Sequence, residues 1–135
     1  MLTISVILTD GSYLMVYAGT INEPYTVGGA KVPNDYSRVL IWATSTDGLI
    51  WKKEGIALDA RNPVLEGFAD GPDLVYWDDG SIRLYFWGYR GIYYSVFQDG
   101  AFSESVLAIE PDNPQNLMYP PSPPGDPTLI NVDGV

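Results

Sequence analysis

The side chains available for chemistry in this sequence are chiefly carboxylates. The 135 residues contain 17 Asp and Glu and 7 Lys and Arg, but no Cys and no His. Thiolate nucleophiles, sulfur-ligated zinc and Ser-His-Asp triads are therefore excluded. Two carboxyl groups held close together can still act as a general acid and base. Each group raises the pKa of the other, so that one of them becomes a proton donor.

Three aspartates stand where such a pair could form. Asp70 and Asp73 lie at or just before the start of an apolar run, and Asp126 precedes a second such run. Aspartates at the starts of neighbouring strands could converge on one site. The alternative is that they only cap turns, which Asp does because its carboxylate accepts hydrogen bonds from nearby backbone N–H groups. Both interpretations stay open at the level of the sequence.

Aromatic and basic side chains could complete a ligand site. Trp42, Trp87 and Tyr89 could offer a flat surface to a sugar ring, and Arg90 could bind a carboxylate through two parallel hydrogen bonds. Core packing of the aromatic residues and surface pairing of Arg90 with acidic neighbours are the alternatives. The pair Asp78-Asp79 would suit calcium, but a hairpin turn accounts for both residues. No metal and no other cofactor is therefore predicted.

The charge balance and the hydropathy exclude several partners. A net charge of −10 repels phosphate backbones and anionic lipid surfaces, so neither nucleic acid nor a membrane is predicted as a partner. No stretch approaches the roughly 20 apolar residues of a membrane helix. Residues 1–9 are predicted to form a strand and not a signal peptide, because no basic region precedes the apolar one. Localisation stays open, with the cytoplasm as the default.

The elements that must position these residues are β-strands. Short apolar runs rich in Val, Ile, Tyr, Phe and Trp are bounded by Gly, Asp and Pro, which is typical of strands and turns. Asp-Gly between two such runs indicates a tight hairpin with positive φ at its central residues. These pairs stand at 10–11, 47–48, 79–80, 99–100 and 133–134. The predicted strands cover 2–9, 13–19, 38–44, 51–58, 73–77, 82–88, 91–97 and 102–109.

The strands fall into repeated units of four. Residues 1–60 are predicted to form one antiparallel meander with an inserted loop at 20–35, and residues 61–110 form a second. Residues 111–135 would hold a proline-rich connector and the first strand of a third unit. Repeats of four strands are typical of propeller blades. The predicted fold is all-β, with about two blades of β-propeller type and the start of a third.

Three passages carry a resemblance to known propellers. The run Ser45-Thr46-Asp47-Gly48-Leu49-Ile50-Trp51 resembles a short Asp-box hairpin, in which Trp51 would pack between neighbouring sheets. Residues 69–88 and 125–130 resemble the blade opening of five-bladed glycoside hydrolases of the arabinanase, xylosidase and fructosidase type. In that family the innermost strand of each blade lines a central funnel that holds the catalytic carboxylates.

The resemblance implies roles for the three aspartates. Asp126 occupies the matching Asp-Pro position, whereas Asp70 stands one place early and strand alternation would turn it to the other face, which leaves Asp73 as a further candidate. Retaining hydrolysis needs two carboxyl groups about 5–5.5 Å apart, and inverting hydrolysis needs roughly 6.5–9.5 Å. No Glu can be matched to the general acid of the family.

Two such blades would leave apolar faces bare, because a propeller blade is covered on both sides. We therefore expect a homo-oligomer, a dimer or a trimer, in which the strand at 127–130 pairs outside its own unit. The predicted function is that of a truncated, glycosidase-like propeller that binds carbohydrate without catalysis of its own. One alternative is a glycoside hydrolase whose carboxylate site is assembled in an oligomer. Another is an interaction module without a ligand.

Overall fold

The regular structure of this protein is built from β-strands alone. The computed structural model describes residues 3–20, 25–27, 30–32, 38–65, 67–88, 90–110 and 127–128, and every regular element among them is a strand, which confirms the all-β prediction. The strands are β1 (Ile4–Thr9), β2 (Ser12–Thr20), β3 (Tyr25–Val27), β4 (Ala30–Val32), β5 (Arg38–Ser45), β6 (Lys52–Leu58), β7 (Ala69–Tyr76), β8 (Ile82–Gly88), β9 (Gly91–Gln98), β10 (Ala101–Phe102) and β11 (Val106–Ile109).

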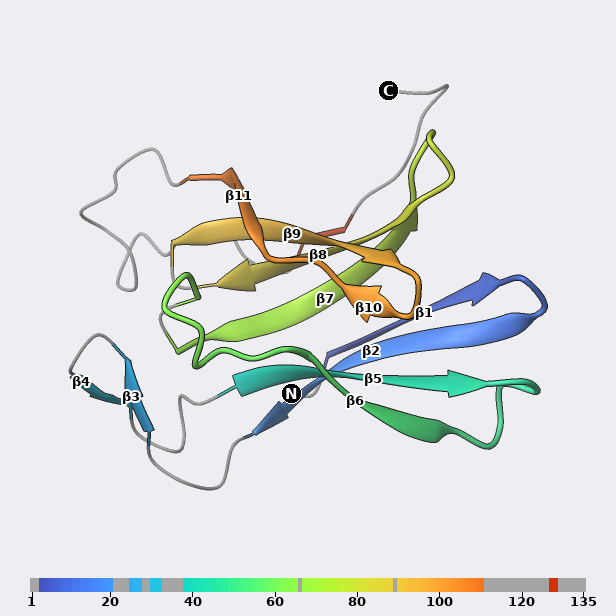
Figure 1. The fold of residues 1–135 in the computed structure, drawn as a ribbon, viewed down its shortest axis with the longest axis horizontal. Helices are drawn as coiled ribbons and strands as arrows, with labels where there is room; N and C mark the ends of the chain where they lie inside the picture. Colours follow the sequence, from blue (N-terminus) through green and yellow to red (C-terminus); the bar gives the residue numbers. More distant parts are fainter. Residues whose placement is uncertain are drawn as a thin grey trace.

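Two antiparallel sheets form two stacked layers (Figure 1). The first sheet has the order β1-β2-β5-β6, and the second has the order β10-β9-β8-β7 with β11 also paired to β9. Each sheet follows the chain as an antiparallel meander, as the repeat predicts. The short β3–β4 hairpin falls within the predicted inserted loop at 20–35. Apart from this hairpin, the described strands form two open sheets, with no closed barrel or ring among them.

Two of the five predicted Asp-Gly pairs make tight two-residue hairpins, whereas those at 47–48 and 79–80 lie in longer loops in which only the glycine has a positive φ, and the pair at 133–134 lies outside the described residues. Asp10 and Gly11 join β1 to β2 with φ angles of 46° and 76°, and Asp99 and Gly100 join β9 to β10 with 53° and 76°. Positive φ at both central residues is the requirement of a primed two-residue turn, whose twist matches that of the flanking strands. Asp tolerates this left-handed backbone better than most residues other than Gly.

Two strand boundaries differ from the sequence-based expectation. The predicted strand at 102–109 is split into β10 and β11, because Ser103 leaves the regular ladder and its hydroxyl accepts a hydrogen bond from the backbone N–H of Val96 at 2.9 Å. The predicted strand at 73–77 begins earlier, at Ala69. Of the predicted strand at 127–130, residues 127–128 are not in a strand, and 129–130 lie outside the described residues, as does the connector at 111–126.

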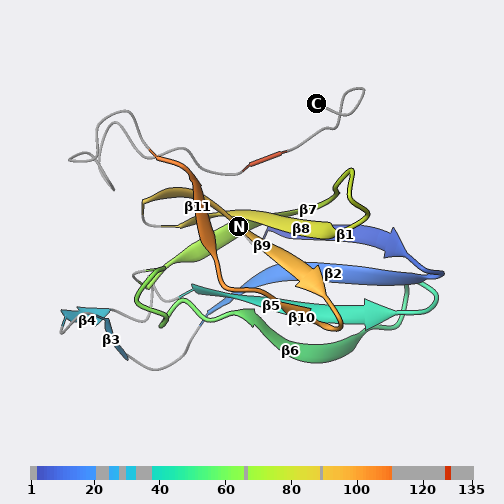
Figure 2. The ribbon, with the colours of Figure 1, turned by 45° about the horizontal axis from the view of Figure 1, so that its top comes forward.

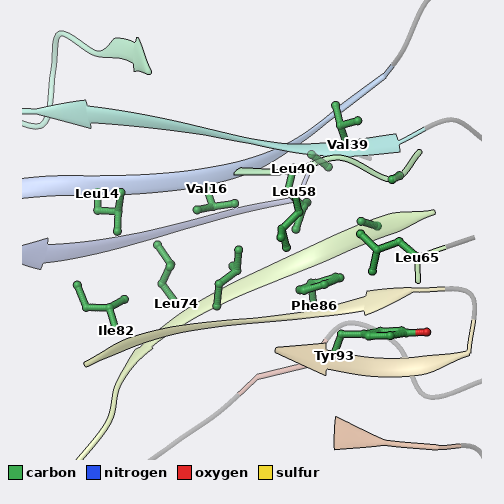
Figure 3. Packing of buried hydrophobic residues seen from close by; sticks show 14 residues of the cluster. Leu14, Val16, Val39, Leu40, Leu58, Leu65, Leu74, Ile82, Phe86 and Tyr93 are labelled. Carbon is green, nitrogen blue, oxygen red and sulfur yellow. The ribbon is translucent and has the colours of Figure 1, made fainter. Parts of the chain in front are cut away.

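The core lies between the two sheets (Figure 3). Val16 of β2 and Leu40 of β5 face Leu84 and Phe86 of β8, and all four side chains are completely buried. Phe86 also stacks on Tyr93 of β9, with 5.7 Å between the ring centroids. Burial of each such side chain stabilises the fold by about 1.5–3 kcal/mol. This packing holds the two layers face to face.

The edge strands β1 and β7 lie side by side where the two sheets meet (Figures 1 and 2). They are not hydrogen-bonded as a ladder, because each belongs to the edge of its own sheet. Their contact is instead made by side chains, and two of the predicted aspartates take part in it.

Candidate functional site

Asp70 and Asp73 are brought to the same side of β7 by a bulge. Asp70 pairs with Trp87 of β8 and Asp73 pairs with Tyr85, so three steps along β7 match two steps along β8. Gly71 between them has a φ of 59°, the left-handed value that favours glycine. In a regular strand, residues three apart point to opposite faces. The extra residue cancels that alternation, so both carboxylates start from one side of the strand.

The junction between β1 and β7 is built by hydroxyl groups on β1 and carboxylates on β7. The Thr3 hydroxyl donates to Asp70 Oδ1 at 2.7 Å and accepts from the backbone N–H of Gly71 at 3.2 Å. The Ser5 hydroxyl accepts from the backbone N–H of Leu74 at 2.9 Å and donates to Asp73 Oδ1 at 3.4 Å. These bonds satisfy N–H groups at the edge of the second sheet, which would otherwise lack a ladder partner.

Arg38, the first residue of β5, completes the junction as an ion pair with Asp70. Its guanidinium donates to Asp70 Oδ2, while Asp70 Oδ1 also accepts the backbone N–H of Gly71 at 2.8 Å. The Asp70 side chain is 8% exposed and that of Arg38 is 31% exposed. Both oxygens of the Asp70 carboxylate are therefore engaged, and the ion pair connects the two sheets at the mouth of their junction.

An aromatic pair adjoins this ion pair. The guanidinium carbon of Arg38 lies 6.0 Å from the ring centroid of Phe68, and Phe68 lies 4.5 Å from Trp87, the cross-strand partner of Asp70. The indole Nε1 of Trp87 is buried and has no hydrogen-bond partner among the described residues. A buried N–H donor without a partner is costly, so it is a natural position for a ligand oxygen or a bound water.

The structure brings together Asp70, Asp73 and Trp87 but not all of the predicted site residues. Trp42 packs against Phe97 and Phe102, at centroid distances of 5.4 and 6.0 Å. It lies four residues along β5 from Arg38, which is about 13 Å in a strand. Arg90 is exposed in the turn between β8 and β9. Asp126 and Tyr89 lie outside the described residues.

Sequence reasoning missed the residues that reach the aspartates from elsewhere in the chain. Thr3 and Asp70 are 67 residues apart, and Arg38 and Asp70 are 32 apart. No local sequence pattern predicts contacts between residues so far apart in the chain. The Gly71-Pro72 pair inside a strand was the one usable signal, because Gly and Pro in a strand often mark a bulge.

The described residues contain neither a cluster of metal-ligating side chains nor a helix of the membrane-spanning kind. No cluster of three or more acidic side chains among them could hold a metal ion. In the pair Asp78-Asp79, considered above as a calcium site, Asp79 accepts hydrogen bonds from the Ser81 backbone N–H at 2.9 Å and from the Ser81 hydroxyl at 2.5 Å. These bonds are the main reason that the pKa of Asp79 is lowered. A search of the same residues finds no helix with the length and hydropathy needed to span a membrane.

Comparison with protein-family models and with curated proteins gives no match to this chain. No model of a protein family matches the sequence. A search among curated proteins finds none that is similar to it. The resemblance to propeller glycoside hydrolases therefore stays an expectation, and the function has to be argued from the junction itself.

Proposed function

We propose that this protein binds carbohydrate at the β1–β7 junction, as a propeller-type, glycosidase-like protein. One observation carries the proposal: the Arg38–Asp70 ion pair adjoins the Phe68–Trp87 aromatic pair, and the Trp87 indole N–H has no partner among the described residues. Sugars present hydroxyl groups at their edges and C–H groups on their faces. Sites for such ligands combine a few fixed polar groups with apolar and aromatic surface.

Arg38 and Trp87 would supply the donors of the site. A guanidinium has five N–H donors in a fixed planar arrangement. Within the described residues, Arg38 donates one hydrogen bond, to Asp70. Its partial exposure leaves further N–H groups for a sugar hydroxyl. Asp70 would act as a positioning residue, because both of its oxygens are already engaged and they fix the guanidinium plane. Asp73 would offer a carboxylate acceptor nearby.

A hydrolytic function is the second candidate, with Asp126, Asp73 and Asp70 as its carboxylates. It is favoured by the bulge that turns Asp70 and Asp73 to one side of β7. Because Asp70 is held in an ion pair, proton transfer would need Asp73 together with Asp126 or a carboxylate from a second copy. Turnover of chromogenic arabinosides, xylosides and fructosides, abolished by Asp73→Asn, would establish this candidate over simple binding.

Binding is tested by calorimetry with neutral arabino-, xylo- and fructo-oligosaccharides. Trp87→Phe keeps an aromatic ring but removes the indole N–H, so we expect at least a tenfold weaker affinity for the sugar that binds. Trp77→Phe is the matched control, because Trp77 directly follows β7 of the same sheet but packs on Tyr85 and Arg83. Its affinity should equal that of the wild type. Absence of binding at millimolar sugar, or equal effects of the two variants, would overturn the proposal.

We also propose that the protein self-associates as a dimer or trimer. Self-association is what the alternative hypothesis, an interaction module without a ligand, would require. The exposed aliphatic side chains of β1 support it, since Ile4, Val6 and Leu8 are 56%, 46% and 55% exposed. Aliphatic groups gathered on one face of a sheet are typical of an interface.

A further inference from the structure

The face of the first sheet that points away from the core is apolar over its middle and open to solvent. Along β1 the exposed residues Ile4, Val6 and Leu8 alternate with residues that face the core. The ladder continues this outer row across the sheet, because Val6 pairs with Met15 of β2 and Met15 pairs with Ala43 of β5. The opposite face of the same strands already covers the core.

A shallow groove of about 410 Å³ runs over this outer face. It is lined by Thr3 at its junction end and by Ile4, Met15, Tyr17, Ala43, Trp51 and Lys53. Trp51, which the Asp-box resemblance expects between neighbouring sheets, lies against Tyr13 with 6.4 Å between the ring centroids and remains partly exposed. The groove therefore offers aromatic and aliphatic surface that the described residues leave uncovered.

The charge of the chain indicates where a second copy could approach. Two chains that each carry a net charge of −10 repel each other over most of their surface. The residues that the register gives the outer face and that are at least partly exposed are Ile4, Val6, Leu8, Tyr13, Met15, Tyr17, Ile41, Lys53 and Ile56, whereas Val39, Ala43 and Ser45 on the same face are buried. None of them is acidic, and Lys53 is basic. Repulsion between two copies is therefore weak at this face.

On the side away from the core, the second sheet exposes aliphatic side chains at its β11 edge, where Val106 and Ile109 are 48% and 54% exposed, but it is closed over its middle strands. Its side away from the core carries Tyr85 and Ile92, which are only 9% and 4% exposed. A head-to-tail stack of first sheet on second sheet would need that side to be open. The open apolar face of the first sheet therefore matches the same face of another copy better than it matches the second sheet, and this is the arrangement of a two-fold symmetric dimer.

We propose that the outer face of the first sheet is a docking surface for a second copy of this chain, packed face to face about a two-fold axis close to Met15. This specifies the surface for the self-association proposed above and is independent of sugar binding. Four strands about 4.8 Å apart and five residues at about 3.4 Å each give a face of roughly 300 Å². Standard interfaces bury about 800 Å² per partner, so the dimer should be weak and form at micromolar concentrations.

The first test is the molar mass of the full chain, measured by sedimentation from about 1 to 300 µM. We expect the mass to rise from 14.9 kDa toward twice that value. Val6→Glu should raise the dissociation constant at least tenfold, because it adds two like charges to the contact. Val106→Glu is the matched control, since Val106 is equally exposed, at 48%, but lies on β11 of the second sheet. It should leave the dimer unchanged.

Cross-linking distinguishes this surface from any other contact between copies. The chain has no cysteine, so Val6→Cys introduces one thiol per copy. A short bismaleimide should join two Val6→Cys chains, because a two-fold axis brings position 6 close to its own counterpart. Val106→Cys chains should stay uncoupled. A wild-type protein that is monomeric at 300 µM, a trimer, or equal cross-linking of the two variants would overturn the proposal. Sugar affinity should be the same in wild type and Val6→Glu, which separates this outcome from a failure of the binding site.

Discussion

Breaking the ion pair between Arg38 and Asp70 is the most direct test of the junction. Arg38→Gln, Asp70→Asn and the double variant form a thermodynamic cycle that isolates the energy of this one contact. Asn keeps an oxygen that can accept from Thr3 and Gly71, so Asp70→Asn removes mainly the charge that faces Arg38. Gln in place of Arg38 leaves the Asp70 carboxylate without its cation.

The burial of the two partners sets the expected magnitudes. Removal of one partner of a fully buried ion pair costs about 3–5 kcal/mol, and a hydrogen bond to a charged group contributes about 1.5–3 kcal/mol. Asp70 is nearly buried, but Arg38 is 31% exposed and can turn toward water. We therefore expect a loss of about 2 kcal/mol for Asp70→Asn and about 3 kcal/mol for Arg38→Gln, with a coupling energy of about 1.5–2 kcal/mol.

Urea unfolding, followed by tryptophan fluorescence, gives the four free energies of the cycle by linear extrapolation. The Asp59–Arg61 pair provides the control cycle, because its side chains are 36% and 50% exposed and its coupling should be below about 1 kcal/mol. A coupling energy for Arg38–Asp70 that is no larger than that of the control would refute the reasoning, because the junction would then not depend on this ion pair.

Two further predictions concern the backbone and the turns. Gly91→Ala should lower the free energy of unfolding by more than about 2 kcal/mol, since the added Cβ would lie 2.1 Å from the Ile109 carbonyl oxygen and break the β9–β11 pairing; Gly11→Ala meets no atom and should cost only about 1 kcal/mol in urea unfolding. The pKa of Asp47 is lowered chiefly by hydrogen bonds from the backbone N–H groups of Ile50 and Leu49. Its carboxylate therefore stabilises the fold above the ordinary pKa of 3.8, and this contribution is lost as the pH falls through the lowered value. Thermal melts should show Asp47→Asn less stable than wild type at pH 7, with the gap closing toward pH 2; a constant gap would contradict this assignment.

The sequence predicts the strands and hairpins well because their causes are local. Apolar runs fix which segments become strands, and Asp-Gly supplies the positive φ that a primed turn needs, as Asp10-Gly11 and Asp99-Gly100 show. The order of strands within each sheet follows, since hairpin-connected strands pair with their neighbours. The split between β10 and β11 was not predictable in this way, because it depends on hydrogen bonds of Ser103 to Val96 and Ser95.

The candidate site was only partly predictable because its contacts are not local. Asp70, Asp73 and Trp87 could be named from their types and positions. Their partners Thr3 and Arg38 could not, because both belong to the other sheet and meet Asp70 only when the two layers pack. Simple alternation of side chains also fails at residues 70–73, where the bulge adds one residue to β7.

The junction couples the assembly of the two sheets to the candidate site. Strands β1 and β7 share no ladder, so the hydroxyls of Thr3 and Ser5 accept the N–H groups of Gly71 and Leu74 that a neighbouring strand would otherwise take. The same Thr3 hydroxyl holds Asp70, and Asp70 holds Arg38. A ligand that binds Arg38 therefore binds only the packed arrangement of both sheets, and it must stabilise that arrangement by mass action. The outer face of the first sheet lies on the other side of β1 and β2, but its groove reaches Thr3, so a second copy centred on Met15 would approach the junction at that end.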